Sequence, residues 1–266
     1  MEPLTMNKTQ NTNRMNLKNI LAGLPALLLL CTACNGNTTT KDDHKPEPVR
    51  LVEIDTTVLG LVIYYPPTDS IELRCFDRPD PESDSSIVFC CAAAFTADFA
   101  TEANHDRICG DHVSGGQYYK RPRLKRNTGA FFVGEDGRYA FMYSPDAKQE
   151  TFRLEFEHAQ AGFTQEMMLR RGERVKTTRP DGNVNQFRAL CLTTGDRLCV
   201  ADAEGPMQFG QFIQLLQQAG MYDALYMDMG PGWNYSWYRE YADSAETYIH
   251  SWPISSATNW LVFYRK

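Results

Sequence analysis

The chain has 266 residues, of which 42% are hydrophobic, and a formal net charge of −6. This length suffices for one large domain or two small ones with a sizeable core. The negative charge disfavours nucleic acid or an anionic membrane surface as the main partner, although a local group of arginines can still attract an anionic substrate.

The first predicted element is a secretory signal peptide. Residues 20–30 form an almost unbroken apolar run after Lys18, a layout typical of signal peptides. The run is too short for the roughly 20 residues of a membrane-spanning helix. Small residues precede Cys34 in a pattern resembling the lipobox of bacterial lipoproteins. We therefore expect residues 1–33 to be removed and Cys34 to be lipidated, with cleavage before Cys31 as the alternative.

A flexible tether is predicted at residues 34–49, which are polar and charged and end in a segment with two prolines. Such a composition stays solvated rather than packing into a core. The folded domain is then expected at residues 50–266. The lipid anchor predicts a membrane partner in the bacterial cell envelope, with the outer membrane as the expected location and the side of the membrane left open.

Short apolar segments separated by turn-rich stretches follow the tether and predict β-strands. The first four are LVEID, GLVIYY, IELRCF and IVFCCAAAF, in residues 51–95. Two hairpins are predicted further along, at residues 129–143 around an Asp136-Gly137 turn and at residues 188–201 around a Gly195-Asp196 turn. Antiparallel pairing should therefore dominate the sheet.

The clearest predicted helix spans Phe209 to Ala219, because its apolar residues recur at helical spacing and Gly220 can end it in a left-handed conformation. The next segment, ALYMD, predicts a short buried strand that ends at Asp228. Together these elements predict a single α+β domain with a mixed, largely antiparallel sheet and few helices.

Six cysteines follow Cys34, and none has the CxxC spacing of a zinc site. Cys191 and Cys199 flank the predicted turn at an even separation, so they should share one face of the hairpin. Disulfides in an oxidising compartment and buried free thiols are equal alternatives for these residues.

The order of parts from Arg188 to Asp228 resembles the phosphodiester glycosidase family. Members of that family have an arginine segment, a strand ending in Asp-Gly, a helix closing on Leu-Gly and the motif Asp-Ala-Leu-Asn-Leu-Asp-Gly-Gly-Gly-Ser. The corresponding parts here are FRAL with Arg188, VADAEG with Asp202, the helix from Phe209, and DALYMDMGPGW with Asp228. The resemblance extends over roughly residues 85–266.

Three departures place the chain in a divergent branch of that family. Tyr226 stands where the family has Asn, residues 229–233 replace the glycine-serine run, and AAAFTADF stands where Asn-Gly-Gly-Phe-Phe is usual.

The resemblance implies hydrolysis of a sugar-1-phosphodiester, such as an N-acetylglucosamine-1-phosphate type, without a cofactor. Such a reaction needs a carboxylate beside an oxocarbenium-like transition state, which is the role expected of Asp228. Arg188 is expected to grip phosphate oxygens, because a guanidinium can donate to them in bidentate fashion. Asp202 is a candidate second carboxylate. The alternatives are that Asp228 caps a turn, Arg188 is a surface charge and Asp202 complements a helix dipole.

Further residues are expected to contact the substrate, a glycan or sugar phosphate. The basic cluster RPRLKRN contributes Arg123, Arg126 and Asn127, and the loop GDHVSGG contributes His112. The glycine-containing loop after Asp228 contributes Gly230 and Gly232, and the aromatic stretch WNYSWYREY contributes Trp233, Asn234 and Arg239. The alternatives are a solvated basic face, a hydrogen-bonded loop histidine and a core aromatic cluster.

Two other functions remain open on the sequence. The first is a non-catalytic surface lipoprotein that binds glycans through residues 233–241. The second is metal-dependent hydrolysis, which His105, Asp106, Asp111 and His112 suggest by residue type. Their spacing matches no specific metal motif, so no metal site is predicted.

Overall fold

The computed structural model describes residues 47–96, 108–120, 128–146, 148–230, 234–250 and 259–266. The predicted signal peptide, Cys34 and most of the tether lie outside these residues and stay predictions. Within the described ranges, no helix combines the length and apolar character needed to cross a membrane.

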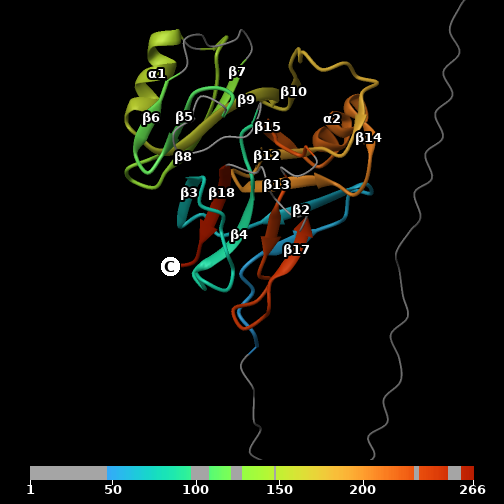
Figure 1. Ribbon diagram of the computed structural model, residues 1–266. Helices are drawn as coiled ribbons and strands as arrows, with labels where there is room; N and C mark the ends of the chain where they lie inside the picture. Colours follow the sequence, from blue (N-terminus) through green and yellow to red (C-terminus); the bar gives the residue numbers. More distant parts are fainter. Residues whose placement is uncertain (1–46, 97–107, 121–127, 147, 231–233, 251–258) are drawn as a thin grey trace, which may run out of the picture. The chain divides into compact units, whose positions relative to one another are not determined.

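Two antiparallel sheets make up most of the described fold (Figure 1). The larger sheet has the principal order β1-β2-β13-β12-β15-β9-β5-β6, with β7, β8 and β10 paired alongside, and the smaller has the order β17-β16-β4-β18-β3. The larger sheet contains β1 (Glu53–Asp55), β2 (Leu61–Tyr65), β5 (His112–Ser114), β6 (Gln117–Tyr119), β7 (Thr128–Gly134), β8 (Tyr139–Tyr143), β9 (Ala159–Arg170), β10 (Glu173–Arg174), β12 (Arg188–Thr193), β13 (Leu198–Ala203) and β15 (Met221–Met227). The smaller sheet contains β3 (Ser70–Cys75), β4 (Ile87–Ala92), β16 (Ser236–Tyr238), β17 (Thr247–His250) and β18 (Asn259–Tyr264).

The remaining described elements are few. They are the paired strands β11 (Val184–Asn185) and β14 (Met207–Gln208) and the helices α1 (Gln149–Glu157) and α2 (Phe209–Gln218). Figure 1 shows α1 beside β6 and α2 beside β14, in agreement with their contacts. The predicted α+β class with a largely antiparallel sheet and few helices is therefore confirmed.

Both predicted hairpins form. β7 pairs with β8 around Gly137, and β12 pairs with β13 around Asp196, with both turn residues at positive φ (76° and 57°). Gly220 also has a positive φ, 73°, directly after α2, as expected of a helix stop.

The two sheets pack face to face through the largest buried cluster, which includes Leu190 and Val200 from the larger sheet and Phe89 and Phe263 from the smaller one. Because side chains alternate along a strand, Arg188 shares this inner face with Leu190, two residues away. The opposite face of the larger sheet packs against α2. Burial of each Phe or Leu in these layers contributes about 1.5–3 kcal/mol.

The described cysteines, Cys75 to Cys199, are free thiols. Cys191 and Cys199 lie directly opposite each other on β12 and β13, on the face that α2 covers, and both are buried. Burial raises the pKa of the Cys191 thiol well above its ordinary value. Of the two alternatives for this pair, the structure therefore has buried thiols.

Candidate active site

A buried ion pair between Arg188 and Asp202 lies at the centre of the candidate site. The hairpin register places the two residues directly opposite each other on β12 and β13. Arg188 Nε donates to Asp202 Oδ1 at 2.6 Å, and Arg188 Nη2 donates to Asp202 Oδ2 at 2.7 Å and to Ser236 Oγ at 2.9 Å. Arg188 is 0% exposed and Asp202 3%. The interpretation of Arg188 as a surface charge is therefore wrong.

The ion pair fixes both the charge and the orientation of the guanidinium. Burial opposes the positive charge of Arg188, but the charge of Asp202 and its hydrogen bonds outweigh burial, so the pKa of Arg188 lies above its ordinary value. Three hydrogen bonds to two side chains leave the group little freedom to rotate. Asp202 therefore positions Arg188 and does not serve as a dipole partner of a helix.

Asp228 directly follows β15, and its carboxyl group is held by backbone N–H groups. Oδ1 accepts from Gly230 N–H at 3.0 Å, and Oδ2 accepts from Thr96 N–H at 3.4 Å. The Asp228 N–H donates to the Ala93 carbonyl oxygen at 2.9 Å, which ties the end of β15 to the segment after β4.

The pKa of Asp228 is raised from 3.8 to about 6. Burial is the main cause, since only 2% of the residue is exposed. The N–H groups of Gly230, Thr96 and Met229 and the charge of Arg188 act in the opposite direction. A carboxyl group with this pKa can gain or lose a proton near neutral pH, as general acid–base catalysis requires.

Asn259, the first residue of β18, holds the segment that donates to Asp228. Its Oδ1 accepts from Ala94 N–H at 2.7 Å, and its Nδ2 donates to the Ala94 carbonyl oxygen at 2.9 Å and to Thr96 Oγ1 at 3.3 Å. Asn259 was not among the site residues predicted from the sequence.

Two polar residues are neighbours of Ser236, one along the chain and one on the paired strand β17. Asn234 precedes Ser236 by two residues, and its carbonyl oxygen accepts from Ser236 Oγ at 3.2 Å. His250 lies directly opposite Ser236 on β17. Burial and the neighbouring charge of Arg188 lower the pKa of His250, against a smaller effect of Asp202. The sequence predicted Asn234 but not Ser236 or His250.

A second arginine lies on the other face of β15. The Arg179 guanidinium is 4.7 Å from the ring centroid of Tyr226, 5.5 Å from that of Phe209 and 5.8 Å from that of Phe187. Tyr226 occupies the position where the resembled family has Asn, and it precedes Asp228 by two residues. The stacking of a cation on Tyr226 gives this departure a physical role that the sequence did not reveal.

Two predicted contact residues lie elsewhere in the fold. His112 is fully buried on β5, where its ring stacks on Tyr119 and its Nδ1 is 3.2 Å from the Gly110 carbonyl oxygen. Arg239 donates to the Pro81 carbonyl oxygen and pairs through its backbone N–H with Val88.

The position of Arg239 separates it from Asp228. Val88 and Ala93, the backbone partners of Arg239 and Asp228, lie five residues apart along β4 and its continuation. At about 3.3 Å per residue this is roughly 16 Å. The structure therefore does not bring Arg239 to Asp228.

The remaining predicted site residues, Arg123, Arg126, Asn127, Gly232 and Trp233, lie outside the described residues, as do His105 and Asp106. Asp111 accepts from the Tyr118 hydroxyl at 2.7 Å and is 3.5 Å from Arg153 Nε. Among the described residues, no three His, Cys, Asp or Glu side chains are grouped as metal ligands.

The aromatic stretch after Asp228 contributes to the core. Tyr235 and Trp237 are buried with Trp260 and Val262 on the outer side of the smaller sheet. The Tyr235 hydroxyl and Trp237 Nε1 both donate to the Pro79 carbonyl oxygen, at 3.1 and 3.3 Å. For these two residues the core interpretation is correct.

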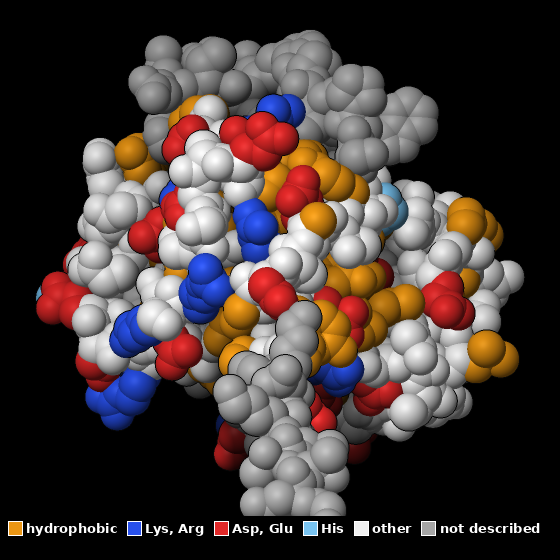
Figure 2. Space-filling model, turned by 90° about the horizontal axis from the view of Figure 1, so that it is seen from below, with side chains coloured by type: hydrophobic (Ala, Val, Ile, Leu, Met, Phe, Trp, Pro, Cys, Tyr) orange, Lys and Arg blue, Asp and Glu red, His pale blue; other side chains and the backbone are white. Residues whose placement is uncertain are grey.

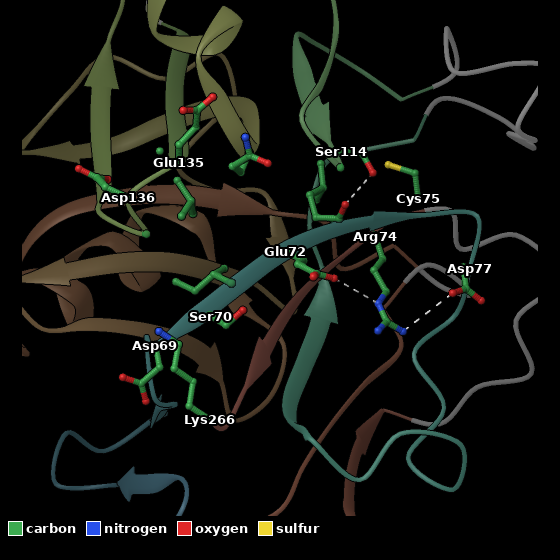
Figure 3. Close-up of a pocket in the computed structure, with 17 residues that line it drawn as sticks. Asp69, Ser70, Glu72, Arg74, Cys75, Asp77, Ser114, Glu135, Asp136 and Lys266 are labelled. Atoms are coloured by element: carbon green, nitrogen blue, oxygen red, sulfur yellow. Dashed lines mark hydrogen bonds and ion pairs between the residues drawn. The ribbon is translucent and has the colours of Figure 1, made fainter.

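An open pocket of about 690 Å³ lies apart from this site, between β3 and the β7–β8 turn (Figure 3). Figure 3 shows Arg74 beside Glu72 and Asp77, with Glu135 and Asp136 on the other side of the pocket. Neither Asp228 nor Arg188 lines it. Its acidic lining disfavours a phosphate group, so we assign the candidate chemistry to Asp228 and Arg188 despite the size of this pocket.

The face of the molecule in Figure 2 has acidic and basic side chains interspersed, with hydrophobic side chains between them. This face therefore has no broad region in which all the charged side chains have the same sign. Attraction of an anionic group depends on individual arginines, of which Arg188 is buried and held in place.

Comparison with known proteins supports the fold. No protein-family model and no curated protein matches the chain. Among solved structures, the chain is similar to the catalytic domain of zebrafish N-acetylglucosamine-1-phosphodiester alpha-N-acetylglucosaminidase, auto-inhibited by its pro-peptide, with a TM-score of 0.53 and 16% identity over 85% of this chain and 86% of that one. A hypothetical protein from Synechocystis has a TM-score of 0.45 and 11% identity over 80% of this chain and 61% of that one. The first likeness shows a distantly shared fold.

Proposed function

We propose that the protein hydrolyses a sugar-1-phosphodiester, with N-acetylglucosamine-1-phosphodiesters as the first candidates. The observation that carries this proposal is a buried carboxyl group, Asp228, with a pKa raised to about 6 by burial and with the cation Arg188 in its electrostatic environment. The likeness in fold to an N-acetylglucosamine-1-phosphodiester glycosidase domain supports the same class of reaction.

In the proposed reaction the bond between the sugar C1 and the phosphate oxygen breaks, and the oxygen of a water molecule bonds to C1. The transition state resembles an oxocarbenium ion. A carboxylate can stabilise its positive charge, or it can act as the general base that takes a proton from the attacking water. Asp228 is proposed for this role. The departing phosphate monoester has a second pKa of about 6, so it needs little protonation by the protein. Arg188, oriented by Asp202, stabilises its negative charge.

The test is turnover of N-acetylglucosamine-1-phosphodiesters by the purified full chain in detergent. Replacement of Asp228 by Asn should lower kcat by about 10²–10⁴-fold, the usual contribution of a general acid or base. Asp223→Asn is a matched control, because Asp223 is also a buried carboxylate of β15 but pairs with Arg170 at 3.0 Å. Binding without product by the wild type, or equal rates for the two variants, would contradict the proposal.

We also propose that the protein acts in the cell envelope, held by a lipid on Cys34 after removal of residues 1–33. The domain from residue 50 would then meet its glycan substrate at the membrane surface. Metabolic labelling with a radioactive fatty acid should label the wild type and not Cys34→Ala, whereas label on Cys34→Ala would point to Cys31.

A further inference from the structure

Three polar atoms around the Arg188–Asp202 pair have no hydrogen-bond partner among the described residues, although all three are buried. They are Arg188 Nη1, Asn234 Oδ1 and His250 Nε2. Leaving a buried polar group unpaired is unfavourable, and most such groups in native proteins have a partner. Three of them in one place therefore need an explanation.

Ser236 links the three residues: it contacts the side chain of Arg188 and the backbone of Asn234, and it lies opposite His250. Ser236 Oγ accepts from Arg188 Nη2 at 2.9 Å and donates to the Asn234 carbonyl oxygen at 3.2 Å. His250 is the cross-strand neighbour of Ser236, and side chains directly opposite each other in an antiparallel pair lie on the same face. The electrostatic effect of Arg188 on His250 agrees with this arrangement.

The chemistry of the three atoms is complementary to a phosphorylated sugar. Arg188 Nη1 presents N–H donors from a permanent cation, while its other nitrogens are occupied by Asp202 and Ser236. A neutral histidine in its Nε2–H tautomer adds one more donor. Asn234 Oδ1 is an acceptor, which suits a sugar hydroxyl or an amide N–H rather than a phosphate oxygen.

We infer that Arg188, His250 and Asn234 form a subsite for the junction between phosphate and sugar. Arg188 Nη1 and His250 Nε2 donate to non-bridging phosphate oxygens, and Asn234 Oδ1 accepts from a hydroxyl or N-acetyl N–H of the sugar. His250 and Asn234 are thus specificity-determining residues of the site. This inference rests on the proposed function, because it takes the ligand to be the sugar-1-phosphodiester that Asp228 is proposed to hydrolyse.

Binding of N-acetylglucosamine 1-phosphate, inorganic phosphate and N-acetylglucosamine to the full chain in detergent, measured by titration calorimetry, tests the subsite. All variants carry Asp228→Asn so that no turnover occurs. His250→Ala should weaken binding of both phosphate-containing ligands about tenfold, and His250→Gln, which keeps an N–H donor, should recover part of the loss. Asn234→Leu should weaken binding of N-acetylglucosamine and N-acetylglucosamine 1-phosphate but leave inorganic phosphate unchanged.

His158→Ala is the control, because His158 is an exposed histidine at the end of α1. Thermal melting identifies any variant that is unfolded; if His250→Ala is unfolded, His250→Gln and Asn234→Leu decide the result. The inference is overturned if the Asp228→Asn protein and a folded His250 variant of it bind the phosphate-containing ligands equally well. It is also overturned if the Asp228→Asn protein does not bind phosphate.

Failure of the subsite differs from failure of the proposed function. Turnover that depends on Asp228 but has a KM unaffected by His250→Ala would overturn the subsite and leave the glycosidase proposal intact. Phosphate binding that depends on His250, in a wild-type protein that releases no product, would support the subsite and contradict the proposed reaction.

Discussion

Two pairs of a buried aspartate with an arginine lie in the larger sheet, and they differ in how many of their hydrogen-bonding groups have a partner. Arg170 donates to Asp223 at 3.0 Å and to Asp146 at 2.8 Å, while Asp223 also accepts from the Arg171 N–H at 3.1 Å. Arg170 has no buried unpaired nitrogen, whereas Arg188 keeps Nη1 without a partner among the described residues. The first pair is complete as a structural element, and the second is complete only with a further acceptor.

The two pairs are far enough apart to be tested independently. Strands β12 and β15 are paired, and in this pairing Arg188 lies opposite Met227 and Leu192 lies opposite Asp223. Asp223 is therefore as far along the sheet from Arg188 as Leu192 is. Four residues along β12 correspond to about 13 Å. Substitutions in one pair should therefore leave the other intact and be nearly additive with it.

The largest expected effect in this comparison is on stability. Asp202→Ala should lower the free energy of unfolding by about 3–5 kcal/mol, because it leaves Arg188 buried without its counter-ion. Asp223→Ala should cost less, since Arg170 is partly exposed and keeps Asp146. Urea unfolding of the two variants measures the difference. Equal losses would contradict the view that Arg188 depends on Asp202 for its charge balance.

The next effect is a pH dependence that belongs to Asp228. Because its pKa is raised from 3.8 to about 6, the folded state binds more protons than the unfolded state between these values. Stability should therefore fall as pH rises from about 4 to about 6, by up to about 3 kcal/mol. Asp228→Asn should remove this fall, whereas Asp223→Asn should retain it. Unfolding midpoints at a series of pH values measure both slopes, and an unchanged slope in Asp228→Asn would refute the raised pKa.

The smallest expected effect is on kcat/KM when each arginine is replaced by lysine, which keeps the positive charge but not the geometry of the guanidinium. Arg188→Lys keeps a cation but loses the bidentate pair and the Nη1 donors, so kcat/KM for a sugar-1-phosphodiester should fall about tenfold or more. Arg170→Lys should change kcat/KM by less than about twofold. Steady-state kinetics on both variants tests this, and equal losses would assign Arg188 a structural role only.

Local sequence patterns predicted the elements that form each part of the site. The turn at Gly195-Asp196 and the strand before Asp228 were both correct, and counting outward from that turn would have paired Arg188 with Asp202. The helix α1 was not predicted, although Phe152 and Phe156 have helical spacing and both are buried.

The partners supplied by the smaller sheet could not be predicted from such patterns. Asn259, Ser236 and His250 come from β18, β16 and β17, which reach the site only through the strand order β17-β16-β4-β18. A period-two pattern shows which face of a strand is buried but not which distant strand lies beside it. These residues therefore appear as ordinary polar positions in the sequence.

The pairing of Arg188 with Asp202 depends on the length of the loop between their strands. Arg188 and Asp202 are equally far along the chain from Gly195. An insertion of one residue within residues 194–196 could shift the register of the two strands by one residue. Arg188 would then lie opposite a neighbour of Asp202, and the two side chains would lie on opposite faces of the sheet. Loop length, more than loop composition, is then the property of this hairpin that evolution must preserve. Insertions elsewhere, such as in residues 176–182, leave that ladder in phase and should be tolerated far better.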